Sequence, residues 1–180
     1  MNYKDVLLTN ENLVKAVTNI FDNVNGNYIL PSIKIAQDLD LEDVIGTVLK
    51  EELQKQVYSN TYKNRYKMLL DDYIQPFLTY SAIVRLIPTV SYKITNAGVV
   101  KTDDEKMTSL SPSDVDKVKA EYQKIADAYR SKLGRFLMAN YNDYPELKEY
   151  RDVSDIRANV YSYASSSICL GGNRGKKISY

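Results

Sequence analysis

The chain of 180 residues has no histidine, no tryptophan and a single cysteine, Cys169. Histidine is the usual general base near neutral pH and the commonest protein ligand for transition metals. One cysteine forms no intramolecular disulfide and cannot complete a zinc site. We therefore expect no catalytic residue, no metal site and no cofactor. An enzyme that works with carboxylates alone is the weakest of the hypotheses considered.

Long hydrophobic runs are also missing from the sequence. No stretch approaches the roughly 20 apolar residues that cross a bilayer, and the beginning, MNYKDVLLTNEN, has no hydrophobic region of a signal peptide. A hydrophobic content of 44% and a net charge of +1 are typical of a single soluble domain. We expect a protein that is made and kept in a cytoplasm and does not contact a membrane.

Three segments contain the residue types of a binding site, but their spacing argues against one. Asp71 and Asp72 are adjacent on a predicted helix and point about 100° apart, so they do not converge on a ligand. The acidic segment 103–105 lacks the residue spacing and the glycine of a calcium loop. The segment 171–177 lacks the GxxxxGK[ST] spacing of a phosphate loop. A solvated surface explains all three segments.

Tyrosine is unusually frequent among the aromatic residues, and charged residues are unevenly distributed along the chain. The chain has 16 tyrosines against 3 phenylalanines. Tyrosine suits half-buried surfaces and interfaces, but an AT-rich genome also raises tyrosine together with asparagine, lysine and isoleucine. Acidic residues are in excess in 1–60 and basic residues in 61–102. Such alternation suits a subunit that meets copies of itself, and it is equally common on an ordinary solvated surface.

The first third of the chain predicts three helices. Asn10 can cap a helix that reaches Val24, where Gly26 would end it with a positive φ. Pro31 is expected in the first turn of a second helix that contains Ala36 and Gln37.

A third helix follows, from Leu41 to Val57, with Asp40 as its cap. Ile45 belongs to its apolar stripe. Gly46 lies inside this helix, where glycine costs about 1 kcal/mol relative to alanine. We expect that another backbone approaches Gly46 closely.

Two longer helices are predicted further on. The first covers about 64–86, with a kink or a junction of two helices at Pro76, and the apolar stretch 77–90 should be the most buried helix of the domain. The second is an amphipathic surface helix from Pro112 to about Asn140. Between them, the alternation in 90–102 around Asn96–Gly98 predicts a β-hairpin, followed by a mobile loop at 103–111. A lone hairpin is marginally stable, so it needs a partner.

The expected fold class is therefore mainly α: a helical bundle of four to six helices with one small β-hairpin and an extended C-terminal tail. Residues 1–153 form the helical domain, and the Ser/Gly-rich residues 154–180, which end in basic residues, form a C-terminal extension.

Three blocks, in this order and spacing, resemble the head–tail connector (adaptor) proteins of tailed bacteriophages, most of all those of the crAss-like phages. The first block is defined by the spacing of Ile33, Ala36, Gln37, Ile45 and Gly46 along the sequence. The second is LDDYIQP at 70–76, and the third is YKITNAGVV at 92–100. With the long helix and the turn at 140–145, the resemblance covers about residues 10–150.

The resemblance implies a virion structural protein at the head–tail junction. Its copies, typically twelve, would form a ring that docks on the portal protein, extends the DNA channel and binds the next connector or tail protein. DNA would pass through the ring without sequence-specific binding. The protein would be synthesised in the host cytoplasm.

Two sets of residues are assigned on this basis. The residues expected to contact the portal or neighbouring subunits are Tyr92, Ile94, Asn96, Gly98, Val100, Ile168, Leu170, Arg174, Lys176, Lys177 and Tyr180. The residues expected to have structural roles are Pro31, Ala36, Gln37, Ile45, Gly46 and Pro76.

An alternative is a small α-helical nucleic-acid-binding protein that acts in packaging or regulation. The basic end of the chain and the basic segment 61–102 favour it. The near-neutral net charge argues against it, because non-specific DNA binding needs a broad basic face.

Overall fold

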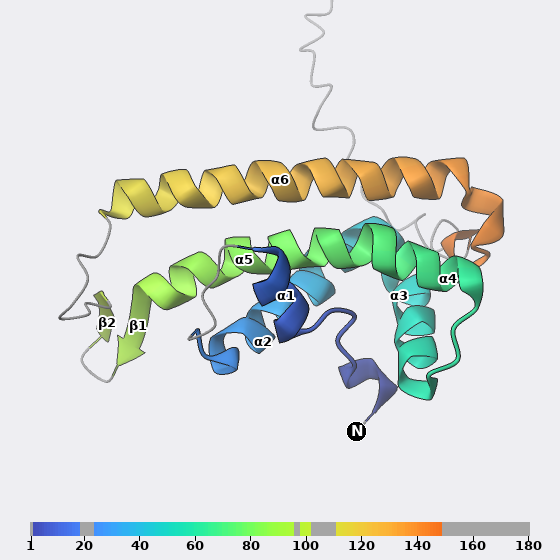
Figure 1. Cartoon of the computed structure of the whole chain (residues 1–180), viewed down its shortest axis with the longest axis horizontal. Helices are drawn as coiled ribbons and strands as arrows, with labels where there is room; N and C mark the ends of the chain where they lie inside the picture. Colours follow the sequence, from blue (N-terminus) through green and yellow to red (C-terminus); the bar gives the residue numbers. More distant parts are fainter. Residues whose placement is uncertain (1, 19–23, 96–97, 102–110, 149–180) are drawn as a thin grey trace, which may run out of the picture.

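The structure, a computed structural model, describes residues 2–18, 24–95, 98–101 and 111–148 (Figure 1). This part of the chain is mainly helical. Its main helices are α1 (Glu11–Val17), α2 (Gly26–Ile35), α3 (Glu42–Ser59), α4 (Asn64–Leu69), α5 (Gln75–Ser91) and α6 (Pro112–Ala139). Short 3₁₀ helices lie at Tyr3–Asp5 and Tyr141–Asp143. No helix of these described residues is long and apolar enough to cross a membrane.

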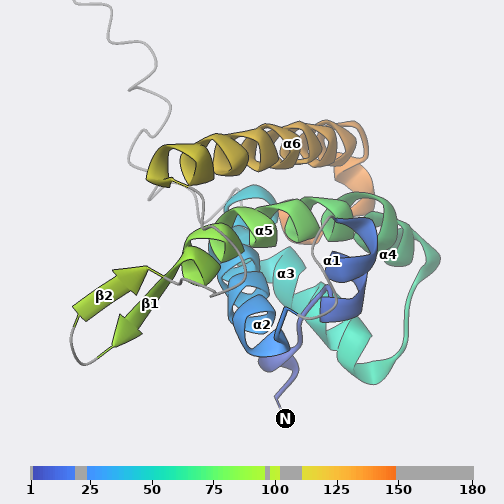
Figure 2. The ribbon, with the colours of Figure 1, turned by 60° about the vertical axis from the view of Figure 1, so that its left-hand side comes forward.

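Helix α5 is the centre of the bundle. Helix α6 runs along one side of α4 and α5, while α1, α2 and α3 pack on the other side (Figures 1 and 2). Leu78 and Thr79 of α5 are fully buried, and its buried residues continue to Leu86. The prediction of a buried helix over 77–90 is confirmed as far as Leu86, whereas Thr89 and Val90 are exposed.

Helix α2 begins five residues before Pro31. The Asn25 side chain accepts a hydrogen bond from the Asn27 N–H and so caps the helix at Gly26. Two predictions are therefore wrong: Gly26 does not end a helix, and Pro31 lies inside α2 rather than in its first turn. The asparagine cap decides the helix start, and the proline is accepted at the loss of one backbone hydrogen bond.

A π-helical segment, Ala36–Leu41, joins α2 directly to α3. Asp40 is part of this segment and caps no helix, so that prediction is wrong. The break in the helix comes later, at Gly46, whose φ of 77° and ψ of 163° lie in a region essentially restricted to glycine. The positive φ accounts for this glycine, and the expected close approach of another backbone stays a prediction.

Ion pairs fix the direction of the chain across Gly46. Lys50, which follows the kink, pairs with Glu42 and lies 3.4 Å from an Asp38 Oδ; both carboxylates precede the kink. Burial alone would raise the pKa of Glu42, but hydrogen bonds from Lys50 and Thr47 outweigh burial and lower it. The charged form of Glu42 is therefore the form that the fold favours.

We predict that this carboxylate makes the fold sensitive to acid. The stabilisation is complete above the unfolded-state pKa of about 4.3 and is lost as the pH falls through the lower folded-state pKa. In urea unfolding across this pH range, Glu42→Gln should flatten the decline in the free energy of unfolding. Asp116→Asn, which removes an exposed carboxylate from α6, is the matched control and should keep the wild-type slope. Equal slopes for all three proteins would contradict the prediction.

A second π-helical segment, Leu70–Ile74, joins α4 to α5 immediately before Pro76. The predicted kink or junction is thus a change of helical register. Pro76 has no N–H to offer to the Asp72 carbonyl oxygen, and Lys132 Nζ of α6 lies 3.5 Å from that oxygen. The proline therefore leaves an acceptor that α6 contacts.

Beyond α5, two four-residue strands, β1 (Tyr92–Thr95) and β2 (Gly98–Lys101), pair antiparallel, with Tyr92 opposite Lys101. The expected strand start at Val90 is wrong, because Val90 and Ser91 belong to α5. Whether this segment contributes to assembly stays a prediction. Asn96, the loop at 103–110 and the extension at 154–180 lie outside the described residues.

Three glutamines hold the N-terminal segment against the bundle. Gln37, fully buried, accepts a hydrogen bond from the Leu8 N–H (2.8 Å) and donates to the Val6 carbonyl (3.0 Å). Gln54 donates to the carbonyls of Val6 and Lys4, and Gln75 to that of Leu8. These side chains satisfy backbone groups of a segment that forms no regular sheet.

Candidate functional site

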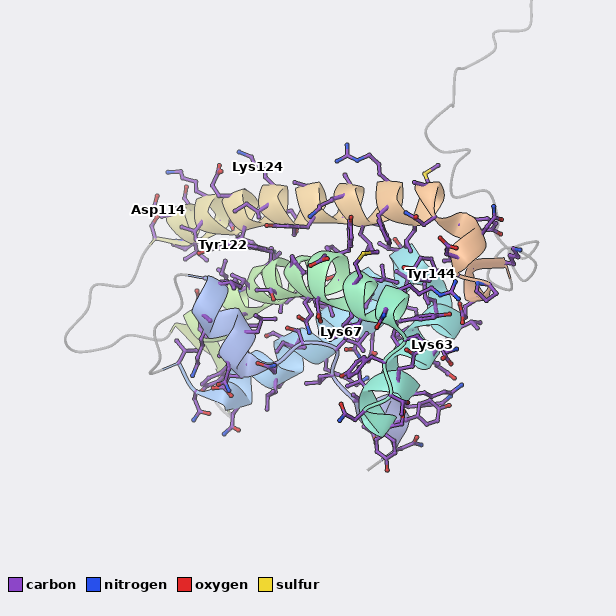
Figure 3. The ribbon with its side chains drawn as sticks, turned by 45° about the vertical axis from the view of Figure 1, so that its right-hand side comes forward. Lys63, Lys67, Asp114, Tyr122, Lys124 and Tyr144 are labelled. Carbon is purple, nitrogen blue, oxygen red and sulfur yellow. The ribbon has the colours of Figure 1, made fainter. Side chains whose placement is uncertain are left out.

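A row of contacting aromatic rings, which we call the aromatic seam, joins α6 and the turn after it to α4, α5 and the π-helical segment between them. Tyr80 stacks on Tyr129 with ring centroids 5.4 Å apart, and Tyr73 stacks on Phe136 at 4.0 Å. Tyr66 meets Tyr144 edge to face at 5.5 Å. In Figure 3, Tyr122 points from α6 toward the helices beneath it, whereas Lys124 points away from them. Many tyrosines therefore pack within the subunit.

Buried hydroxyl groups in this seam have polar partners. Tyr66 donates a hydrogen bond to Glu146 (2.8 Å) and Tyr144 to the Arg65 carbonyl (3.1 Å). Burial, and then the hydrogen bond to Glu146, raises the pKa of Tyr66 well above its ordinary value. Burial likewise raises the pKa of Tyr144. Both tyrosines stay neutral at physiological pH and serve as anchors of the turn after α6.

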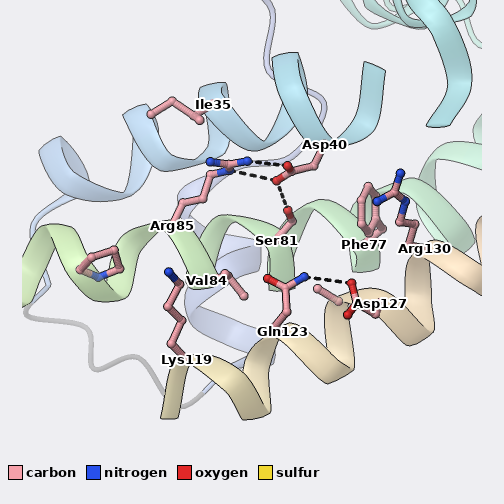
Figure 4. A pocket seen from close by; sticks show the side chains of 12 residues that line it. Ile35, Asp40, Phe77, Ser81, Val84, Arg85, Lys119, Gln123, Asp127 and Arg130 are labelled. Atoms are coloured by element: carbon pink, nitrogen blue, oxygen red, sulfur yellow. Dashed lines mark hydrogen bonds and ion pairs between the residues drawn. The ribbon is translucent and has the colours of Figure 1, made fainter. Parts of the chain in front are cut away.

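On one flank of the seam, a groove of about 350 Å³ separates α6 from α2 and the π-helical segment, with α5 as its floor (Figure 4). We call it the α2 groove. Apolar atoms come from Ile35, Val84 and Pro88. Charged side chains come from Arg85, Asp40, Lys119, Asp127 and Arg130. Its lining is therefore mixed, with one positive charge in excess.

Asp40 and Arg85 form the polar centre of the α2 groove. The Arg85 guanidinium donates two hydrogen bonds to the Asp40 carboxylate, at 3.0 Å and 2.5 Å, and Ser81 donates a third. The hydrogen bond to Asp40 raises the pKa of Arg85. A two-pronged contact of this kind fixes the geometry of both side chains. It therefore ties α5 to the end of α2, but both charges remain about a quarter to a third exposed.

Lys119 differs from the other cations in the α2 groove. Arg130 pairs with Asp43, whereas Lys119 has no ion-pair partner in the part of the chain that the structure describes. Figure 4 shows Lys119 rising from α6 toward the side of the groove where Arg85 lies. The α2 groove can thus accept a carboxylate from a partner.

On the opposite flank of the seam, a smaller groove of about 210 Å³ lies between α1, α5 and α6. We call it the α1 groove. Its apolar lining consists of Val17, Tyr80, Tyr122 and Ile125. Glu121 is its only charged residue. The two grooves thus differ in volume and in the net charge of their lining residues.

Exposed apolar side chains extend both grooves into broader surfaces. Tyr28, Pro31 and Ile35 of α2 and Leu39 of the π-helical segment recur at helical spacing, and all are exposed. Leu39 keeps 58% of its accessible surface and Ile35 keeps 43%. Val17, Val118 and Ile125 are exposed beside the α1 groove, at 47%, 40% and 39%. Contiguous apolar surface of this kind is typical of protein–protein contact.

Most of the predicted residues fall into three sets: buried residues, strand residues and residues outside the described part of the chain. Ala36, Gln37, Ile45 and Gly46 are all buried where α2 and α3 meet, as a structural role requires. Tyr92, Ile94, Gly98 and Val100 lie in the two strands. Asn96, Ile168, Leu170, Arg174, Lys176, Lys177 and Tyr180 lie outside the described residues.

Sequence reasoning missed both grooves. Asp40 and Arg85 are 45 positions apart, so no local pattern links them. The seam had a readable signal: Tyr66, Tyr73 and Tyr80 recur every seven residues, as do Tyr122, Tyr129 and Phe136. Two such series on antiparallel helices indicate a packed seam. No group of three acidic, histidine or cysteine residues with metal-site geometry occurs among the described residues.

Comparison with known protein families gives a match over much of the chain. Residues 41–154, more than half of the chain, match the model of a family of unknown function (DUF6712). The match begins in the π-helical segment and contains all of α3 to α6. No curated protein and no solved structure matches the chain.

Proposed function

The chain belongs to the DUF6712 family, and we propose that it is a virion structural protein, a subunit of the head–tail connector ring. In this role it docks on the portal, extends the DNA channel and links the capsid to the tail. The ring is expected to contain about twelve copies, as the resemblance to phage connectors implies. The proposal rests on that resemblance together with the surface of the described residues.

The carrying observation is the exposed apolar surface on two flanks of the seam. A monomer with no partner would gain nothing from Leu39 at 58% exposure beside Ile35 and Tyr28. The symmetry of a ring requires each copy to present one surface to each of its two neighbours. Two separate apolar flanks on one subunit therefore favour assembly over a role as an isolated domain.

The alternative, a small nucleic-acid-binding protein of packaging or regulation, has less support. Basic residues on α6 alternate with acidic ones: Lys117 pairs with Asp114 and Lys124 with Glu121. Duplex DNA binding usually depends on a basic face that neutralises several phosphates. Salt-dependent DNA binding by the purified full chain would favour the alternative.

The direct test is the protein content of purified virions that carry this gene. We expect the chain in virions by mass spectrometry and, by electron cryomicroscopy, ring density below the portal into which α5 and α6 fit. Detection in infected cells but not in virions would overturn the proposal. Monomers in solution leave it intact, because the portal can template the ring.

We also predict that deletion of residues 162–180 leaves the bundle folded but weakens its association with the portal. The described core ends at Leu147, so the deletion removes none of it. The thermal transition should stay cooperative, with an unchanged midpoint, while retention on portal-containing particles falls. Loss of the cooperative transition would contradict the first half, and full retention would contradict the second.

A further inference from the structure

We propose that neighbouring copies of this chain meet head to tail, with the α1 flank of one copy seated on the α2 flank of the next. The α1 flank consists of Val17, Val118, Glu121 and Ile125; the α2 flank is the α2 groove with Ile35 at its rim. The inference deepens the proposed function, on which it rests, by naming the surfaces of the contact.

The two flanks lie on opposite sides of the seam. Successive residues of α6 are about 100° apart, so Lys119 and Gln123 project to one side of the buried position Ala126, and Glu121 and Ile125 to the other. The linings of the two grooves agree with this arrangement, since α1 contributes Val17 to the α1 groove alone, and the end of α2 contributes Ile35 to the α2 groove alone. Surfaces on opposite sides of a subunit can contact two different neighbours.

Their unlike character decides the symmetry of the contact. A two-fold contact pairs a patch with itself, so like charges face each other near the axis. Here the charged residue lining the α1 groove is Glu121, whose pair with Lys124 of the same helix is an exposed and therefore weak one, and the α2 groove carries Lys119 without an ion-pair partner among the described residues. A head-to-tail contact brings these two opposite charges together, whereas a self-paired contact would not.

Apolar burial supplies the attraction. Val17, Val118 and Ile125 on one flank, and Ile35 on the other, each keep about two fifths to one half of their surface exposed. Burial of apolar surface is the main driving force of association, and charge complementarity then fixes the register. Since each copy has one flank of each kind, every added copy leaves one flank of each kind free until the ring closes.

The test uses two variants that each disable one flank: Ile125→Glu for the α1 flank and Ile35→Glu for the α2 flank. Both side chains are partly exposed, so the subunit should still fold, which a urea midpoint checks. The oligomeric state is measured by native mass spectrometry and sedimentation over a concentration series. Met68→Glu, on α4 and at 43% exposure, is the matched control outside both flanks.

We expect the wild type and Met68→Glu to assemble beyond dimers as the concentration rises and each flank variant to stay monomeric. An equimolar mixture of the two variants should form dimers and nothing larger, because each variant contributes its one intact flank. Three results would overturn the inference: a wild type that stays monomeric at every concentration, a flank variant that assembles like the wild type, or a mixture without dimers. If virions contain the protein, any of these results leaves the proposed function standing.

Discussion

Replacement of Gly46 by alanine should lower the free energy of unfolding by about 1–3 kcal/mol, although alanine adds a single methyl group. Gly46 has a φ of 77° and a ψ of 163°, a combination that residues with a Cβ avoid. The residue is also buried, between the fully buried Ile45 and the ion pairs that span the kink. The strain therefore cannot be relieved by a local rearrangement into solvent.

Gly46→Leu should cost more than Gly46→Ala. It adds overpacking of a buried position, typically about 1–3 kcal/mol, to the same backbone strain. The measurement is the urea midpoint of both variants, with the slope of the transition as a check that the unfolded state is unchanged.

The matched control is Gly134→Ala in α6. A Cβ at this position meets nothing within 4 Å. Alanine in a helix interior is favoured over glycine by up to about 1 kcal/mol, so this variant should equal or exceed the wild type in stability. Wild-type stability of Gly46→Ala would show that Gly46 does not hold the backbone conformation described here.

Helices with a clear amphipathic pattern were predicted well from the sequence, whereas the roles of individual glycines and prolines were not. The amphipathic pattern of 112–140 predicted α6 within a residue or two, because apolar periodicity reports directly on the face that packs. Glycine and proline positions predicted the ends of the helices less reliably. Gly26 reads equally well as a helix end or a helix start, and the Asn25 side chain decides between them.

The candidate site was harder to predict than the helices. The α2 groove exists because Asp40, Arg85 and Lys119, from three separate elements, come together only in the folded chain. A π-helical segment places Asp40 where an α-helix would have continued in a different register, and no pattern of residues in 36–41 indicates such a segment. The aromatic seam, by contrast, repeats every seven residues and was open to prediction from the sequence.

Replacement of Gln37 by leucine should destabilise the subunit by about 1–3 kcal/mol, because a buried backbone donor loses its acceptor. Gln37 Oε1 accepts from the Leu8 N–H at 2.8 Å, and Gln37 is fully buried, so water cannot take over the contact. The Val6 carbonyl is less affected, since Gln54 still donates to it at 2.8 Å. The cost therefore falls on one amide, that of Leu8.

Because the loss is confined to the Leu8 amide, it can be measured at that single amide. The Leu8 amide should lose hydrogen-exchange protection in Gln37→Leu, while the amides of α5 keep theirs relative to the global stability. Gln123→Leu is the control: its exposed amide donates to Asp127, so the change should stay within about 0.5 kcal/mol. An unchanged urea midpoint and unchanged Leu8 protection in Gln37→Leu would mean that the N-terminal segment is held by the burial of Leu8 alone. Destabilisation with a protected Leu8 amide would instead place the loss in the packing around Gln37.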